Sequence, residues 1–208
     1  MPASDTPREQ LPSPSGAATA ADKASLRRGV VATRVAMSDT ERATAGRLLR
    51  DQVLELPEVA AAGTIAAYYS VGTEPGTHAL VFALWKRGSY VVLPVLLADG
   101  DLDWASYEGP DSLVPGPKGL LQPVEPARGP GTVARADVIL VPALSVDAGG
   151  HRLGRGGGSY DRALARVSAQ VPTIALVYDT ELVPALPTDP HDQQVRAVAR
   201  PSHGLTWF

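Results

Sequence analysis

The sequence predicts an α/β fold: a mixed, mainly parallel open sheet that is covered by helices on both faces, in a single domain. Three observations support this. Segments with helical periodicity alternate with short apolar runs, and those runs are apolar throughout, as in strands covered on both sides. The chain has 208 residues, enough for one domain with a sizeable core and too few for two ordinary ones.

Two helices are expected at the N-terminal end. Residues 22–36 place apolar side chains four positions apart on one face and basic side chains on another. Ser38 and Glu41 have the spacing of a capping box, which starts a second helix that continues to about Leu56. Pro57 lies just past that end.

Two strands and a helix follow. Residues 64–70 form a short apolar run that suits a buried strand. Thr77 is expected to cap the next helix, and Gly88 to end it. Residues 90–97 form the second strand.

The next segment adds an antiparallel strand. Asp99 and Gly100 are a turn signal, and residues 102–107 then alternate in polarity. Within residues 109–131, 11 of 23 residues are Gly or Pro, so a long loop inside one domain is expected there.

A strand, a glycine-rich loop and a helix come next. Residues 137–144 form the strand and residues 159–170 the helix. Six glycines lie in the ten residues 149–158 between them, and residues 173–178 form a further strand. In open α/β sheets, ligands bind at the carboxyl ends of strands, so this loop is the first candidate for a ligand site.

Composition limits the classes of function. The net charge is −3, so no overall field favours nucleic acid, and cysteine is absent, which excludes disulfides, thiolate chemistry and cysteine-bound zinc. No apolar run approaches the ~20 residues that span a bilayer, and the N-terminus has no signal-peptide pattern. We expect a cytoplasmic monomer with a disordered tail over residues 1–20 and one domain over residues 21–208.

The glycine-rich loop has the chemistry of a phosphate site. Glycines let successive backbone N–H groups point into one concavity, and a helix N-terminus adds unpaired donors. Arg152 and Arg155 add guanidinium groups that bind phosphate oxygens. The composition is also typical of a mobile surface loop, and the spacing fits neither the Walker pattern nor the dinucleotide fingerprint. The arginines favour the phosphate site.

The segment VPALSVDAGGHRLGRGGGSYDRAL, residues 141–164, resembles the signature of the 5-formyltetrahydrofolate cyclo-ligase (methenyltetrahydrofolate synthetase) family. Further segments are similar to that family in the expected order, namely residues 23–27, 70–77, 119–123 and 186–192. The resemblance covers about residues 22–200, and the glycine signature is its most specific part.

This resemblance implies an ATP-dependent ring closure of 5-formyltetrahydrofolate to 5,10-methenyltetrahydrofolate, with release of ADP and phosphate and with Mg²⁺ present. The formyl oxygen attacks the γ-phosphate, N10 of the folate attacks the activated carbon, and phosphate leaves. Such a site chiefly positions ATP and neutralises charge. ATP and a reduced folate are the implied partners.

The resemblance also implies roles for individual residues. Arg155 is the expected stabiliser of charge in the transition state. The implied nucleotide-binding residues are Lys23, Arg27, Arg152, Gly154, Arg155, Gly156, Gly157, Gly158, Ser159 and Tyr160. The implied folate-binding residues are Tyr69, Glu74 and Tyr160, and the Mg²⁺-associated carboxylates are Asp161 and Asp192. A lone loop histidine such as His191 is read as neither metal ligand nor base.

The chain departs from the family pattern at five positions. Ser159 stands for a tyrosine and Gly157 for a common lysine, and the other departures are Glu181, Arg196 and Arg200. The missing lysine and tyrosine keep open a non-catalytic nucleotide or folate binder of the same fold. A third hypothesis is another enzyme on a similar sheet, for example a sugar-phosphate isomerase or an acyl-CoA transferase, although no local pattern for their catalytic carboxylates is visible.

Overall fold

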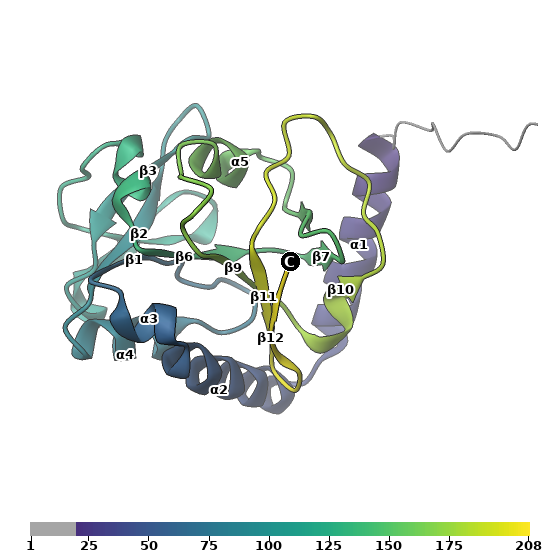
Figure 1. Cartoon of the computed structure of the whole chain (residues 1–208), viewed down its shortest axis with the longest axis horizontal. Coiled ribbons are helices and arrows are strands. Elements are labelled where there is room, and N and C mark those ends of the chain that lie inside the picture. The colour runs from purple at the N-terminus through teal and green to yellow at the C-terminus, as the bar shows by residue number, and fades with distance from the viewer. Residues whose placement is uncertain (1–19) are drawn as a thin grey trace, which may run out of the picture.

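A computed structural model describes residues 20–208. Within these residues, seven strands form one sheet in the order β12-β11-β9-β6-β1-β2-β3 (Figure 1). In chain order the strands are β1 (Thr64–Ala66), β2 (Tyr90–Leu96), β3 (Leu102–Ser106), β6 (Val138–Pro142), β9 (Thr173–Leu176), β11 (Ala197–Arg200) and β12 (Gly204–Trp207). The five inner strands pair in parallel, and the two edge strands β3 and β12 are antiparallel. The predicted mixed, mainly parallel sheet is confirmed.

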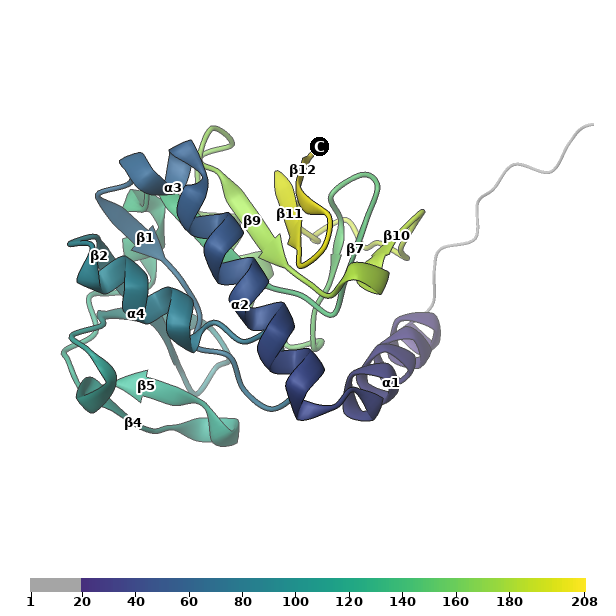
Figure 2. The same cartoon turned by 90° about the horizontal axis from the view of Figure 1, so that it is seen from below.

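Helices cover both faces of this sheet, as predicted. On one face lie α2 (Asp39–Glu55), α3 (Pro57–Ala61) and α4 (His78–Lys86) (Figures 1 and 2). On the other face lie α5 (Ser159–Leu164) and the 3₁₀ segment η3 (Pro130–Arg135). Neighbouring strand residues point to opposite layers, so Ile65 packs with the α2 side and Ala66 with the α5 side.

The first helix, α1 (Ala20–Ala36), stands beside the sheet and not on it. It lies next to a small sheet of β10 (Leu182–Val183), β7 (Ser145–Asp147) and β8 (Arg152–Leu153) (Figure 1). Ala20 belongs to α1, one position before the predicted start of the domain. The rest of the predicted disordered tail, residues 1–19, falls outside the described residues.

The capping box of α2 is confirmed, but the predicted cap of α4 is wrong. The Ser38 hydroxyl accepts a hydrogen bond from the Glu41 N–H at 3.2 Å, and Glu41 Oε2 accepts from the Ser38 N–H at 2.7 Å. Thr77 stands at the N-cap position of α4, yet its hydroxyl makes no cap hydrogen bond. It donates instead to the Tyr68 carbonyl at 2.7 Å and accepts from the Ser70 N–H at 2.9 Å. These bonds turn the chain after Ala67, so the strand predicted over residues 64–70 ends at Ala66.

The helix predicted over residues 159–170 is also too long, because α5 ends at Leu164. Turn hydrogen bonds follow it, from the Arg166 N–H to the Ala163 carbonyl and from the Val167 N–H to the Leu164 carbonyl. The Arg166 side chain contacts Asp101 at 2.5 Å, which fixes this turn against the β2–β3 connection.

The predicted Gly/Pro loop contains structure of its own. A hairpin of β4 (Leu113–Pro115) and β5 (Leu121–Pro123) follows the 3₁₀ turn η1 (Pro110–Ser112), and a second 3₁₀ turn, η2 (Pro117–Gly119), connects its two strands (Figure 2). Gln122 Oε1 accepts a hydrogen bond from the Leu96 N–H at 2.6 Å and so fixes the hairpin to the end of β2. A further turn, η4 (Asp179–Glu181), follows β9.

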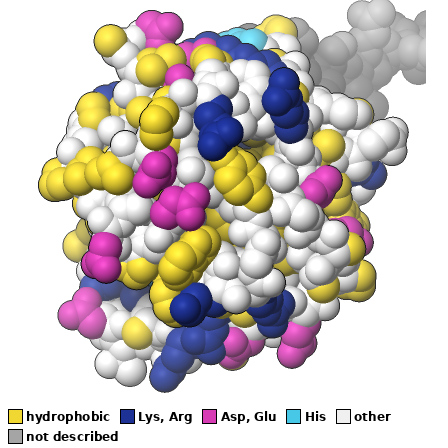
Figure 3. All heavy atoms as spheres, turned by 90° about the vertical axis from the view of Figure 1, so that its left-hand side faces the viewer, with side chains coloured by type: hydrophobic (Ala, Val, Ile, Leu, Met, Phe, Trp, Pro, Cys, Tyr) yellow, Lys and Arg dark blue, Asp and Glu magenta, His cyan; other side chains and the backbone are white. Residues whose placement is uncertain are grey.

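The surface carries no dominant charge of one sign on the face seen in Figure 3. Acidic and basic side chains both occur there, with basic ones at the lower edge and in the upper half, and hydrophobic ones among them. Within residues 20–208, no helix has the length and apolar character that crossing a membrane requires.

Candidate active site

A cavity of about 710 Å³ lies at the carboxyl ends of β1, β2 and β6. Its walls come from α1, from the end of β2, from the chain that follows β1 and β6, from residues 118–121, from the glycine-rich loop and from residues 189–192. Every residue that the sequence assigns to a site lines this one cavity: Lys23, Arg27, Tyr69, Glu74, Arg152, Gly154, Arg155, Gly156, Gly157, Gly158, Ser159, Tyr160, Asp161 and Asp192.

A tight hairpin of β7 and β8 leads into the glycine-rich loop. The buried Asp147 carboxylate accepts hydrogen bonds from the N–H groups of Gly149 and His151, both at 2.9 Å, and closes the turn. Gly150 has φ +83°, and a Cβ there would lie 2.5 Å from the Val195 carbonyl oxygen. No other residue fits this turn without backbone movement.

The far end of the loop is fixed to the β2–β3 turn. The Ser159 hydroxyl donates to the Gly100 carbonyl at 2.5 Å, and the Arg162 guanidinium donates to the same carbonyl at 2.6 Å. Arg162 also donates to the Gly157 carbonyl at 3.1 Å. Ser159, one of the departures from the family pattern, therefore fastens the loop with a short hydroxyl side chain.

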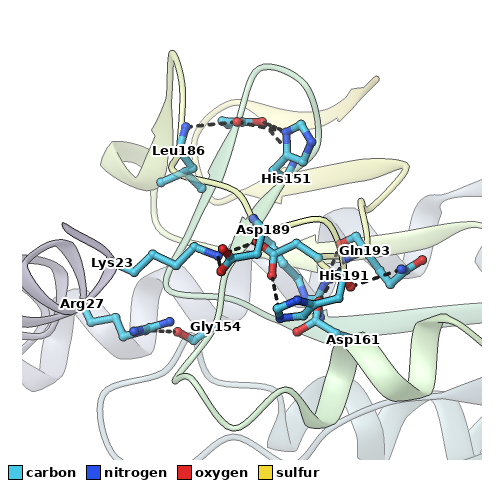
Figure 4. A network of polar contacts seen from close by, with 12 residues as sticks. Lys23, Arg27, His151, Gly154, Asp161, Leu186, Asp189, His191 and Gln193 are labelled. Atoms are coloured by element: carbon cyan, nitrogen blue, oxygen red, sulfur yellow. Dashed lines mark hydrogen bonds and ion pairs between the residues drawn. The ribbon is translucent and has the colours of Figure 1, made fainter. Parts of the chain in front are cut away.

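Three basic residues of α1 line the cavity, and Lys23 and Arg27 are the two nearest its N-terminal end. Lys23 Nζ lies 2.7 Å from Asp189 Oδ2 and 2.5 Å from Asp192 Oδ2 (Figure 4). Burial lowers the pKa of Lys23, but its hydrogen bonds and charge pairing with the two aspartates outweigh burial and raise the pKa above its ordinary value. Arg27 Nε donates to the Gly154 carbonyl at 2.8 Å, at the start of the loop (Figure 4).

Two further cations come from the loop itself. The buried Arg152 donates to Asp161 Oδ1 at 3.0 Å and to the Gln193 carbonyl at 2.5 Å. Burial lowers the pKa of Arg152, and the Asp161 charge offsets only part of that effect. Arg155, with 61% of its side chain exposed, lies 3.0 Å from Glu74 Oε1. Although the chain has a net charge of −3, Lys23, Arg27, Arg152 and Arg155 together provide a local site for anions.

Aromatic side chains form another part of the wall. Tyr69 stacks on His78 with ring centroids 3.9 Å apart and an interplanar angle of 10°. Tyr68 lines the cavity as well, which the sequence analysis missed. The only local signal is the Tyr-Tyr pair at the end of the first apolar run, and the pattern does not say which ring faces a ligand.

Carboxylates gather beside Lys23. Ligand atoms of Asp189, His191 and Asp192 lie within 4.8 Å of one another, so His191 is closer to a potential cation site than its sequence context indicates. Asp161 is not part of this group. Its Oδ1 accepts from Arg152 and from the Gln193 N–H, the latter at 3.0 Å.

A buried ion pair lies under the cavity. Arg34 is 1% exposed and Glu181 is 4% exposed. Arg34 Nε and Nη2 donate to the two Glu181 oxygens at 2.7 and 2.8 Å, and Nη2 also donates to the Ala143 carbonyl at 2.8 Å. Glu181 is another departure from the family pattern, and each of its two carboxylate oxygens accepts a hydrogen bond from Arg34. The sequence analysis also missed Arg34, which lines the cavity.

Comparison with known proteins agrees with this geometry. The sequence model of the 5-formyltetrahydrofolate cyclo-ligase family matches residues 19–201. A 5-formyltetrahydrofolate cyclo-ligase of Mycolicibacterium smegmatis is 44% identical over 147 residues, which cover 68% of this chain and 75% of the relative. That of Escherichia coli K12 is 30% identical over 177 residues, which cover 84% of this chain and 97% of the relative.

A solved structure is similar over nearly the same extent. The NMR structure of the 5,10-methenyltetrahydrofolate synthetase of Aquifex aeolicus superposes with a TM-score of 0.77 at 26% identity. The match covers 89% of this chain and 92% of that chain. With the family match across residues 19–201, these similarities show that the chain belongs to the 5-formyltetrahydrofolate cyclo-ligase family.

Proposed function

We propose that this protein catalyses the ATP-dependent cyclisation of 5-formyltetrahydrofolate to 5,10-methenyltetrahydrofolate, with release of ADP and phosphate. The observation that carries the proposal is the convergence of all predicted site residues on one cavity, from segments as far apart in sequence as Lys23 and Asp192. Membership of the family supports the same reaction.

The cationic part of the cavity suits a triphosphate. Lys23, Arg27, Arg152 and Arg155 line the cavity together with the glycines of the loop, and backbone N–H groups of such loops are donors to anions. Arg155 is the most accessible of the four, so its guanidinium is able to turn from Glu74 towards a γ-phosphate. We assign to Arg155 the stabilisation of charge on the transferred phosphoryl group.

The proposed reaction has two steps. The formyl oxygen attacks the γ-phosphorus, and the bond to the bridging oxygen breaks to release ADP. N10 then attacks the activated formyl carbon and loses its proton, and the C–O bond breaks to release phosphate. The formyl group is a poor electrophile before phosphorylation, so the residues of this chain act mainly by holding both reactants in line.

The carboxylates of the cavity fit Mg²⁺, which prefers oxygen ligands and retains water. Asp192 lies beside Asp189, and both already contact a cation, Lys23 Nζ. Within residues 20–208, both hydrogen bonds of the Asp161 carboxylate use Oδ1, which leaves Oδ2 for an ion. We propose that Asp161 and Asp192 hold the ion, which when bound neutralises charge on the polyphosphate.

Formation of the methenyl product tests this function directly, because its absorbance appears only after ring closure. Mixing the protein with 5-formyltetrahydrofolate and Mg-ATP should give an ATP-dependent signal. Arg155→Ala should lower turnover at least ~10²-fold, as loss of one preorganised charge donor does. The control is Arg135→Ala, an exposed arginine of η3 outside this cavity, which should leave turnover unchanged.

Absence of the signal in folded protein that still binds ATP or folate by calorimetry would favour the non-catalytic binder. An unchanged rate in Arg155→Ala would remove that residue's assignment. The cytoplasmic location, the monomeric state and the single domain over residues 21–208 stay predictions. Size-exclusion chromatography tests the monomeric state.

A further inference from the structure

One cation of the cavity wall, Lys118, has no partner. Seven lysine and arginine side chains line the cavity. Within residues 20–208, six of them contact a carboxylate or a backbone carbonyl: Lys23, Arg27, Arg34, Arg152, Arg155 and Arg162. Lys118 is exposed and makes no hydrogen bond or ion pair with another residue of this range. Its charge is therefore accessible to a ligand and is not already neutralised.

The backbone at Lys118 is unfavourable for a lysine. The residue lies in η2, the turn between β4 and β5, with φ +56° and ψ +26°, and Gly119 follows with φ +75°. The Leu120 N–H donates to the Pro117 carbonyl at 3.1 Å and closes the turn. Turns with two successive positive φ values favour Asn, Asp or Gly at the first position, because a longer side chain is strained there. A lysine at such a position indicates a function outside the turn itself.

Lys118 belongs to an apolar part of the cavity wall. Leu120 and Leu121 of the same hairpin line the cavity, and so do Pro94 and Leu96 of β2. The hydrogen bond from the Leu96 N–H to Gln122 holds the hairpin against the end of β2. Figure 2 shows the β4–β5 hairpin and α1 well apart from each other. The cations proposed for the triphosphate come from α1 and the glycine-rich loop, whereas Lys118 comes from the hairpin.

The proposed reaction brings two kinds of anion into the cavity. ATP carries a triphosphate, and a reduced folate carries the carboxylates of its glutamate part, which an aromatic ring joins to the pterin. The cations of α1 and the glycine-rich loop are proposed for the triphosphate. An apolar wall suits the aromatic ring of the folate, and an ammonium group on that wall suits a carboxylate.

We propose that Lys118 is a substrate-binding residue whose ammonium group pairs with a carboxylate of the glutamate part of the reduced folate. The residue lies in the Gly/Pro segment, to which the sequence analysis assigned no site. This inference rests on the proposed function, because it takes a reduced folate as the ligand.

Lys118→Met tests the role, since it removes the charge and keeps most of the side chain. The KM for 5-formyltetrahydrofolate should rise about 3–5-fold, as for loss of one ion pair near the surface, while the KM for ATP stays within about 1.5-fold. Lys118→Arg should keep most of the wild-type value, because it restores the charge. With 5-formyltetrahydropteroate, which lacks the glutamate part, wild type and Lys118→Met should have equal KM values.

The chain offers a matched control. Lys86 is an exposed lysine in the last turn of α4 and does not line the cavity. Lys86→Met should leave the KM values for both substrates unchanged. A second variant, Lys118→Gly, should reproduce the KM effect of Lys118→Met and have a Tm equal to or above wild type, because glycine relieves the strain of the turn.

Four results would overturn the inference. They are an unchanged KM for 5-formyltetrahydrofolate in Lys118→Met, an equal rise with 5-formyltetrahydropteroate, a rise in the KM for ATP, which would assign the lysine to the triphosphate, and a Tm of Lys118→Gly below wild type, which would show that the lysine serves the turn.

Failure of the proposed function is distinguishable from failure of this inference. If wild-type protein shows no turnover, the proposed function fails, and calorimetric titration with 5-formyltetrahydrofolate replaces the KM. A Kd raised about 3–5-fold by Lys118→Met then supports the role of Lys118. An unchanged Kd, or no binding by wild type, refutes it.

Discussion

Replacing Arg34 by methionine should lower the free energy of unfolding by about 3–5 kcal/mol, the usual cost of removing one partner of a buried ion pair. Arg34 is almost fully buried and supplies two of the donors to Glu181, at 2.7 and 2.8 Å. In the variant, the Glu181 side chain keeps the Tyr178 N–H at 2.8 Å. The Ala143 carbonyl loses its donor from Arg34 as well.

The size of this loss follows from what stays behind. The methionine side chain fills most of the space of the arginine stem, so the cost comes from an uncompensated carboxylate and not from a cavity. For a chain of this length, 1 kcal/mol shifts the Tm by about 2–4 °C, so the Tm should fall by roughly 6–20 °C.

Urea denaturation monitored by circular dichroism measures the loss, provided that the m-value matches wild type. The double variant Arg34→Met/Glu181→Met removes both charges and should recover at least half of the lost stability. A loss below about 1 kcal/mol in the single variant, or a double variant no more stable than the single one, would refute this reasoning.

Two other predictions concern an exposed helix cap and a largely buried carboxylate. Ser38→Ala removes one half of the capping box with Glu41 and should cost about 1 kcal/mol in urea denaturation, whereas Ser38→Thr should keep most of it; equal losses would contradict the capping role. The hydrogen bond from Arg166 lowers the pKa of Asp101, so its ionised form stabilises the fold above about pH 4 and the contribution is lost as pH falls through the folded pKa. Between about pH 4 and pH 2, Asp101→Asn should therefore lose less stability than wild type, and a parallel decline would argue against it.

Most main-sheet elements as far as β9 could be predicted because they have local causes, whereas β11 and β12, which complete the sheet, were not predicted. The capping box at Ser38 starts α2 where expected, and the turn at Gly100, with φ +83°, reverses the chain between β2 and β3. The end of α5 has no such local cause. The sequence after Leu164 continues a helical pattern, and the turn there is fixed by contact of Arg166 with Asp101, 65 positions away.

The small sheet was missed for a different reason. Strands of two or three residues, such as β8 and β10, are too short to show any period. The hairpin around Asp147, which depends on the positive φ of Gly150, folds β8 back on β7, and β10 pairs in parallel with β7 from a segment about 30 residues further along the chain.

The site was predictable to the extent that its residues belong to motifs. All residues that the sequence assigns to the site line one cavity, but Tyr68 and Arg34 entered the site only with the structure. Both are buried polar side chains, and whether such a side chain faces a cavity or the core depends on contacts between distant segments. Glu181 illustrates this: as a sequence departure it had no visible partner, because Arg34 lies 147 positions away.

The contacts of Lys23 with Asp189 and Asp192 join positions 166 and 169 residues apart. During translation, this wall of the cavity cannot close until Asp192, 169 residues after Lys23, has left the ribosome, so a shorter nascent chain lacks the complete binding site. A ligand that contacts both α1 and the segment of Asp189 and Asp192 should stabilise the folded protein. Bound ligand should therefore slow proteolysis of these two segments.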